Sequence, residues 1–276
     1  MRLGIVAAPR PLEGATSVAA RLGEVGRLAE ALDYGGLWIT DSLGRGMASL
    51  DPLLLLAAVA PVTRKIELGT CVLQIPLRHP VELAQRVMSL DVLAEGRLRL
   101  GVGAGSTEAD FLAVEADYQG RFKALRKNLE IMRQAWRGEA VFGPALTPWP
   151  GHEQGPQMFL GAWHSPRWVD YAARQCQGWM ASGIYSTIDA VGEGVANFHA
   201  AGGKRVILAN VFTDLRPQAV RHPLIERAKI NLVCDPGEAR ERLARIADSG
   251  VDDVLLICPF ADPGPLEQVR DLAPGA

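Results

Sequence analysis

A strand–helix repeat of about thirty residues is the feature of the sequence that most restricts its fold. Short apolar runs that read as strands contain Leu3, Leu37, Ile66 and Leu98, which lie 34, 29 and 32 residues apart. One strand with its following helix needs about 30 residues, so this spacing is typical of repeated βα units. The repeat predicts a parallel sheet with helices outside it.

Eight such units can be followed along the chain. The expected strands are Arg2 to Ala7, Gly36 to Thr40, Ile66 to Leu73, Gly96 to Gly103, Gln157 to Ala162, Gly178 to Ser182, Arg205 to Thr213 and Asp252 to Pro259. Helical patterns separate them, at Ala15 to Leu32, from Asp51 onward, and at Pro80 to Leu93, Arg121 to Trp136 and Pro166 to Cys176. Eight strands favour a closed (β/α)8 TIM barrel over an open doubly wound sheet. We expect a single domain over residues 1–276, with a short excursion (Gly138 to Pro156) after the fourth unit.

Composition and charge exclude several classes of protein. The formal net charge is −2 and no Lys/Arg-rich run occurs, so a nucleic-acid partner is not expected. The longest apolar stretch, Pro52 to Val62, is too short for a membrane span and reads as a buried helix. Cys71, Cys176, Cys234 and Cys258 are scattered without a C-x-x-C pair, which indicates free thiols in a reducing cytoplasm and no zinc site.

The stretch "LRLGVGAGSTEADF" places Gly101, Gly103 and Gly105 directly after an expected strand. A dinucleotide fingerprint needs a third glycine where this chain has Ser106. The glycines could instead only permit a tight turn. In a third interpretation, Gly103, Ala104, Gly105 and Ser106 form the floor under a flat cofactor ring, because barrel active sites lie at the carboxyl ends of strands.

Three longer stretches resemble the bacterial luciferase-like family of flavin and deazaflavin enzymes. They are "LAEALDYGGLWITDSL", "IELGTCVLQIPLRHPVELAQRVMSLDVLAEGRLRLGVGAGSTEADF" and "RFKALRKNLEIMRQAW", which cover most of Leu28 to Gly178. The resemblance returns weakly at "DPGEARERLARIADSGVDDVLL". It implies a TIM barrel with reduced FMN, or coenzyme F420, lying across the mouth near the early strands.

The resemblance also implies particular site residues on the second and third strands. It places a non-proline cis peptide at Thr70–Cys71, behind the ring. Gln74 and Ile75, nearer the strand end, are expected to face the ring or the substrate. Asp41 matches a family aspartate and is either a site acid or a turn residue. Ser42 stands where the family often has histidine, and a hydroxyl cannot replace imidazole as an acid or base near neutral pH.

A second stretch, Trp163, His164 and Ser165, resembles the family's phosphate-binding turn. It precedes an expected helix, whose free N–H groups favour an anion. Ser165 would also serve as the helix N-cap, and Trp163 stands where glycine is more usual.

Charged residues elsewhere carry less specific expectations. For Arg78 and His79 we favour a structural role, with His79 capping the helix that begins at Pro80. The acidic residues after the glycine turn are most simply a solvated loop; they are Glu108, Asp110, Glu115 and Asp117.

The expected function is that of a luciferase-like monooxygenase, which uses reduced FMN and oxygen to oxygenate a small-molecule substrate. A separate flavin reductase or NAD(P)H would supply electrons. The alternatives are an F420-dependent dehydrogenase or reductase, which transfers hydride, and a non-catalytic flavin-binding barrel in which Ser42 marks lost chemistry. Substrate choice is expected from loops Gly44 to Ala48, Gly143 to Pro156 and Asp214 to His222. The family often forms homodimers through barrel helices.

Overall fold

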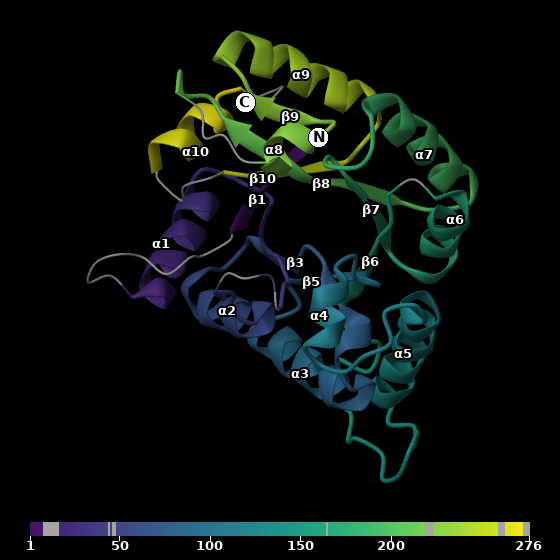
Figure 1. The fold of residues 1–276 in the computed structure, drawn as a ribbon. Coiled ribbons are helices and arrows are strands. Elements are labelled where there is room, and N and C mark those ends of the chain that lie inside the picture. Colours follow the sequence, from purple (N-terminus) through teal and green to yellow (C-terminus); the bar gives the residue numbers. More distant parts are fainter. Residues whose placement is uncertain are drawn as a thin grey trace.

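The computed structural model describes residues 1–7, 17–43, 45, 48–163, 165–218, 223–258 and 263–272. Parallel strands form a closed barrel with helices around its outside (Figure 1). Its eight strands are β1 (Arg2–Ala7), β2 (Gly36–Ile39), β3 (Glu67–Thr70), β5 (Leu98–Gly103), β6 (Gln157–Gly161), β7 (Gly178–Ser182), β8 (Arg205–Asp214) and β10 (Asp253–Ile257). Pairing of β10 with both β1 and β8 closes the ring. The predicted TIM barrel is confirmed.

The third strand differs from the prediction, because it is interrupted in its second half. The cis peptide bond joins Cys71 to Val72, one residue later than expected. The Cys71 N–H still donates to the carbonyl of Ile39 at 2.8 Å, so pairing with β2 continues through Cys71 and the chain departs only afterwards. The chain then resumes as β4 (Leu73–Gln74), which pairs with β5.

The helices follow the expected pattern. They are α1 (Val18–Ala31), α2 (Pro52–Val59), α3 (Pro80–Leu93), α4 (Glu108–Leu112), α5 (Arg121–Trp136), α6 (Pro166–Gln175), α7 (Ile188–Ala200), α8 (Pro223–Arg227), α9 (Pro236–Asp248) and α10 (Pro263–Arg270), with 3-10 turns η1 (Ala60–Val62) and η2 (Ile75–Leu77). Asp51 caps α2 by accepting the N–H groups of Leu53 and Leu54. The expected start of the first helix at Ala15 lies outside the described residues. None of the described helices is long and apolar enough to cross a membrane.

A short strand, β9 (Asn231–Val233), pairs in parallel with the last three residues of β8. The barrel interior is filled by an apolar cluster of Val6, Trp38, Cys71, Phe159, Met180, Ile207, Ala209 and Leu255. Because these side chains fill the interior, ligands must be bound at an end of the barrel and not within it.

Charged side chains occupy the amino-terminal end of the barrel. Glu67 lies at the start of β3, where its carboxylate accepts hydrogen bonds from Arg205 at 2.6 Å and from Arg99 at 2.8 Å. Arg205 also pairs with Asp253 at 2.7 Å, and Arg2 joins both carboxylates from the rim. This network closes the amino-terminal end with paired charges.

The excursion between α5 and β6 runs along the outside of α3, from His79 at its start to Asp91 near its end. His152 in this segment contacts Asp91 of α3 through its Nδ1 at 2.6 Å, and the segment projects away from the barrel (Figure 1). Trp149 is 54% exposed there. A loop that precedes a strand starts opposite the carboxyl-end mouth, but Phe142 of this segment reaches His79, the N-cap residue of α3. The role of Gly143 to Pro156 in substrate choice stays a prediction.

Candidate functional site at the barrel mouth

Val72 is the central side chain of the mouth, at the carboxyl end of the early strands. It lies between two glycines: a Cβ on Gly103 would come within 2.6 Å of Val72 Cγ2, and one on Gly161 within 2.9 Å of Val72 Cγ1. Val72 itself is only partly buried. The partly exposed Val72 and Gly161, with the buried Gly103 packed against Val72, form a small apolar patch, which we call the Val72 shelf (Val72, Gly103, Gly161).

The glycines of the turn allow other parts of the protein to approach closely. A Cβ on Gly101 would lie 1.9 Å from the carbonyl oxygen of Thr70, so glycine is needed for β3 to approach. Gly105 has φ +84°, and a Cβ there would lie 2.7 Å from Gln74 Oε1. Thr70, Val72 and Gln74 occupy the space beside these glycines, and the cofactor floor from Gly103 to Ser106 stays a prediction.

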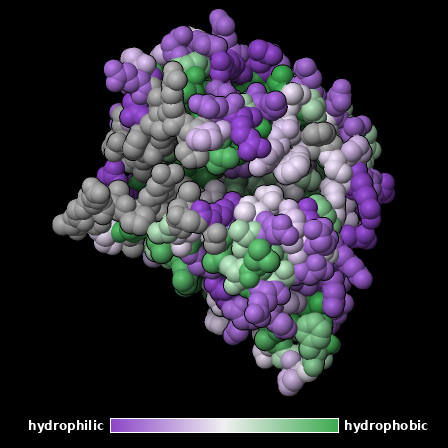
Figure 2. All heavy atoms as spheres, in the orientation of Figure 1, coloured by the Kyte–Doolittle hydropathy of each residue, from purple (hydrophilic) through white to green (hydrophobic). Residues whose placement is uncertain are grey.

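The molecular surface is hollowed on this face. Figure 2 shows the recess between α4 on one side and α8 on the other, with apolar atoms in its depth. Both helices lie in loops that follow barrel strands, β5 and β8, so the recess lies at the carboxyl ends of the strands. This is where barrel enzymes place their chemistry.

Asp41 is an anchor of the loop after β2. Its Oδ2 accepts hydrogen bonds from the Gln74 N–H at 2.8 Å and from Arg78 Nη1 at 2.7 Å, while Oδ1 accepts from Arg78 Nη2 at 3.0 Å. Burial alone would lower the pKa of the Arg78 guanidinium, but the Asp41 and Asp51 carboxylates outweigh it and raise that pKa. Asp41 is 7% exposed and fully engaged, so the geometry favours a structural role.

Gln74 bridges two loops from beneath. Its Nε2 donates to the Asp41 carbonyl at 3.2 Å and to Asp110 Oδ2 at 2.9 Å. Its Oε1 is buried and has no hydrogen-bond partner within the described residues. Unpaired buried acceptors are costly, which marks this amide as one that a ligand or water would satisfy.

Asp110 contradicts the expectation of a solvated acidic loop. Its side chain is fully buried and forms a bidentate ion pair with Arg45, while Oδ1 also accepts from the Leu43 N–H at 3.3 Å. Sequence reasoning missed this residue. The available signal was its place beside Phe111, which is also fully buried, in a short helix directly after the glycine turn.

Three other expected residues present little to the mouth. The Ser42 hydroxyl is bonded to that of Ser49 at 3.0 Å, and Thr70 Oγ1 donates to the Gly101 carbonyl at 2.7 Å. Burial raises the pKa of the Cys71 thiol to about 12, and its Sγ lies 3.7 Å from Asn210 Oδ1. Thr70 and Cys71 thus support the shelf from below.

The loop after β5 is held through its backbone. The Ser106 carbonyl accepts from the Tyr118 hydroxyl at 3.2 Å, and the Gly105 carbonyl accepts from Arg121 Nε at 3.2 Å. Ala104 is buried, whereas Ser106 is exposed. Of the four residues expected to form a cofactor floor, Ser106 is therefore the one whose side chain reaches solvent.

The expected phosphate turn follows β6. Ser165 occupies the N-cap position of α6, but its side chain makes no capping bond. Pro166 has no N–H and the Trp168 N–H donates to the Ser165 carbonyl at 2.9 Å, so Arg167 supplies the first-turn N–H that has no partner within the described residues. Trp163 is 49% exposed and stacks on Tyr185 from the loop after β7. His164 lies outside the described residues. His79 is likewise an N-cap residue, of α3, whose side chain makes no capping bond. Its ring contacts Phe142 instead, so the expectation that His79 caps this helix is wrong.

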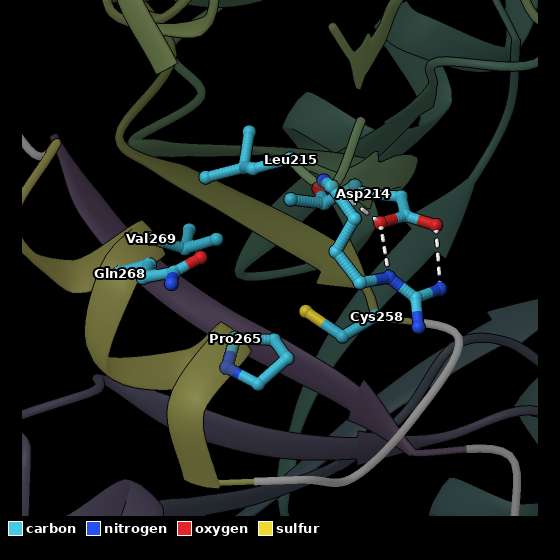
Figure 3. A pocket seen from close by; sticks show the side chains of 8 residues that line it. Asp214, Leu215, Cys258, Pro265, Gln268 and Val269 are labelled. Carbon is cyan, nitrogen blue, oxygen red and sulfur yellow. Dashed lines mark hydrogen bonds and ion pairs between the residues drawn. The ribbon is translucent and has the colours of Figure 1, made fainter. Parts of the chain in front are cut away.

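Two cavities lie away from the Val72 shelf. One, of about 10 Å³, is formed where β8, β10 and α10 meet, and holds about one water (Figure 3). Arg216 binds Asp214 there through two contacts of 2.8 Å, and burial raises the pKa of Cys258 to about 12, with Asp214 adding to the effect. The other, of about 250 Å³, is an outer groove beside His79 and Phe142. Neither contains the expected site residues.

Comparisons with known proteins agree with this architecture. The sequence model of the luciferase-like monooxygenase family matches residues 1–224. An uncharacterized protein of Mycobacterium tuberculosis is 30% identical over 225 residues, 78% of this chain and 72% of that protein. A 4-hydroxyprotoasukamycin monooxygenase of Streptomyces nodosus subsp. asukaensis is 35% identical over 116 residues, 41% of this chain and 31% of that protein.

Deazaflavin enzymes are also among the relatives. An F420-dependent glucose-6-phosphate dehydrogenase of Nocardia farcinica is 30% identical over 171 residues, 55% of this chain and 49% of that protein. Among solved structures, a monooxygenase from Streptomyces bottropensis superposes with a TM-score of 0.82 at 21% identity, over 99% of this chain and 96% of that chain. The match over residues 1–224 identifies this chain as a member of the luciferase-like monooxygenase family of oxidoreductases.

Proposed function

We propose that this protein is a flavin-dependent monooxygenase that binds reduced FMN at the barrel mouth. The Val72 shelf is the observation that carries the proposal, because it offers a small apolar patch at the carboxyl ends of β5 and β6. A flat, largely apolar ring fits such a surface. When bound, reduced FMN supplies the electrons with which oxygen is activated for transfer to a small organic substrate.

The residues of this chain would mainly bind, orient and exclude water. Val72, Gly103 and Gly161 would support the ring, and the unpartnered Gln74 Oε1 is an acceptor that fits an N–H edge. In the first turn of α6, the Arg167 N–H is the backbone donor that would suit the phosphate, since Trp168 N–H is bonded to the Ser165 carbonyl. These features fit the group, although Trp163 is bulkier than the glycine usual in that turn.

Acid–base catalysis by the loop after β2 receives no support. The Asp41 carboxylate is engaged by Arg78 and Gln74, and the Ser42 hydroxyl is bonded to Ser49. This arrangement agrees with a site whose residues position the reactants while a bound cofactor carries out the redox chemistry. This favours the oxygenase over an enzyme that needs a protein acid at Ser42.

Coenzyme F420 is the second candidate, favoured by the 30% identity to an F420-dependent dehydrogenase. In that case the protein would transfer hydride and would not consume oxygen. A non-catalytic flavin-binding barrel is the third. Parallel fluorescence titrations of the purified chain with FMN and with F420 separate these candidates. FMN binding with substrate-dependent oxygen uptake supports the proposal, binding of F420 alone replaces it, and FMN binding without any turnover indicates sequestration.

The electron donor and the oligomeric state are part of the same proposal. We expect a separate flavin reductase or NAD(P)H to deliver the electrons. A homodimer is favoured by a row of exposed apolar residues at four-residue spacing along α2 and its flanks: Leu50, Leu54, Ala58 and Val62. Light scattering on the purified protein measures its mass directly, and the variant Leu54→Glu should shift a dimer toward the monomer.

A further inference from the structure

Two aromatic side chains stack on each other at the rim of the mouth. Trp163 follows β6 and Tyr185 follows β7; their ring centroids lie 4.4 Å apart with an interplanar angle of 32°. The side chains are 49% and 41% exposed. Among the aromatic pairs of the described residues, this is the one in which both members are exposed hydrophobics, since partners such as Phe159 and Phe198 lie in the core.

The backbone on both sides of this pair is fixed. Ala162, directly before Trp163, donates its N–H to the Met180 carbonyl at 3.1 Å and accepts from Trp179 Nε1 at 2.6 Å. On the other side, the Ser182 carbonyl accepts the N–H of Tyr185 at 3.3 Å. The backbone beside both rings is therefore anchored, and the rings contact each other without a ligand, which lowers the entropic cost of stacking a third ring on them.

The position of the pair relates it to the Val72 shelf. Gly161, two residues before Trp163, is the glycine that contacts Val72, so the aromatic rim begins directly beside the shelf. Exposed aromatic faces beside a concave site are typical of the walls that hold flat ligands. Aliphatic side chains would bury apolar area equally well but would not select for planarity.

We infer that Trp163 and Tyr185 form a stacking wall for the substrate, and that the substrate is a planar aromatic molecule. This inference rests on the proposed function, because it names the substrate class of the same mouth. It assigns Trp163 to the substrate and leaves the phosphate of the cofactor to the first turn of α6.

Calorimetry with 2-naphthol as the probe tests the inference, with decahydro-2-naphthol as its saturated counterpart. Both are titrated into the full chain, with and without saturating FMN. The variants are Trp163→Leu and Tyr185→Leu. Trp149→Leu is the matched control, because Trp149 is similarly exposed, at 54%, but lies on the excursion beside His152, which contacts Asp91 near the end of α3. Circular dichroism and thermal unfolding check that each variant is folded.

The wild type should bind 2-naphthol more tightly than decahydro-2-naphthol. Trp163→Leu and Tyr185→Leu should each weaken 2-naphthol binding about threefold to tenfold, the range of an aromatic pair. Trp149→Leu should bind 2-naphthol as tightly as the wild type does. The affinity for FMN should be unchanged in the variants. Equal binding of the two probes, an equal loss in Trp149→Leu, or no loss in Trp163→Leu would overturn the inference.

Failure of the proposed function is distinguishable from failure of the stacking wall. If neither FMN nor F420 binds, yet 2-naphthol binding depends on Trp163, the proposed function is wrong and the wall stands. If FMN binds and competes with 2-naphthol, and Trp163→Leu loses FMN, the pair belongs to the cofactor and the inference is overturned.

Discussion

Asp110 and Arg45 lie 65 residues apart in the sequence and form a bidentate ion pair, with Arg45 Nε 3.1 Å from Oδ1 and 3.0 Å from Oδ2 of the carboxylate. The Asp110 side chain is fully buried, whereas that of Arg45 is 34% exposed. The same carboxylate accepts from Gln74 and from the Leu43 N–H. One buried charge thus joins the loop after β2 to the loop after β5, on either side of the mouth.

The two partners should respond unequally to substitution. Arg45→Met leaves a buried carboxylate without its cation and should lower the free energy of unfolding by about 2 to 3 kcal/mol, less than for a wholly buried pair because Arg45 is partly solvated. Asp110→Asn leaves the arginine free to reach solvent and should cost about 1 kcal/mol. Urea unfolding of both variants measures the difference.

The double variant Arg45→Met with Asp110→Asn is the control for this pair. In the Asp110→Asn background, loss of Arg45 should cost less than about 0.5 kcal/mol, because no buried charge remains. If the losses of stability in the two single variants add up to the loss in the double variant, the Arg45–Asp110 contact contributes little to stability.

The barrel could be predicted because its signals are local. Apolar runs and helix-start residues recur every thirty residues, and the expected bounds of Arg2–Ala7, Pro80–Leu93 and Gly178–Ser182 agree with the structure. The site was harder to predict because long-range contacts define it. Val72 is placed by Gly161, 89 positions later, and nothing in the sequence around either residue indicates the contact.

Asp110 shows that the burial of a charged residue, too, depends on long-range contacts. The local composition "STEADFLAVEAD" resembles a solvated turn, and it becomes a buried anchor only because Arg45 and Gln74 arrive from distant segments. The expected site residues Thr70, Cys71 and Gln74 do lie together at the mouth. Their roles, as supports beneath it, follow from hydrogen bonds that a sequence does not display.

Glu67 should make the stability of the barrel depend on acid pH. Burial alone would raise the pKa of this carboxyl, but Arg205, Arg99 and Arg2 outweigh burial and hold the pKa below its ordinary value. A carboxyl whose pKa is lower in the folded state stabilises fully above the unfolded-chain value, about 4.3, and that contribution is lost as the pH falls further. Urea midpoints should therefore decrease between about pH 4.5 and pH 3.

The variant Glu67→Gln isolates this contribution. It should be less stable than the wild type at pH 7, because Arg99 loses its anion and Arg205 keeps only Asp253. The difference between the two proteins should shrink as the pH falls toward 3. A constant difference across this range would show that another carboxyl controls the acid limb.

The four thiols should differ in reactivity toward Ellman's reagent. Burial raises the pKa of Cys71 and Cys258 to about 12 and that of Cys176 to about 11, so these thiols stay protonated at pH 8. Because only the thiolate attacks, they should react slowly. Cys234 has the smallest rise in pKa of the four, so it should account for the fast phase.

Cys234→Ser should remove that fast phase, while Cys258→Ser should leave it intact. All four thiols should react in 6 M guanidinium chloride, which calibrates the total. A fast phase that persists in Cys234→Ser would mean that the barrel mouth around Cys71 or the β10 end around Cys258 opens readily.

Gly103 and Val72 should be coupled in both stability and cofactor binding. Gly103→Ala places a Cβ 2.6 Å from Val72 Cγ2, and the branched valine has little freedom to move away. Overpacking of this kind costs about 1 to 3 kcal/mol, and we expect FMN affinity to fall as the shelf is distorted. Val72→Ala removes the clashing methyl group, so adding it to Gly103→Ala should recover part of the lost stability. Thermal unfolding and FMN titration of the two single variants and the double variant measure the coupling; a double variant less stable than Gly103→Ala would mean that Gly103 is required for a reason other than room for Val72.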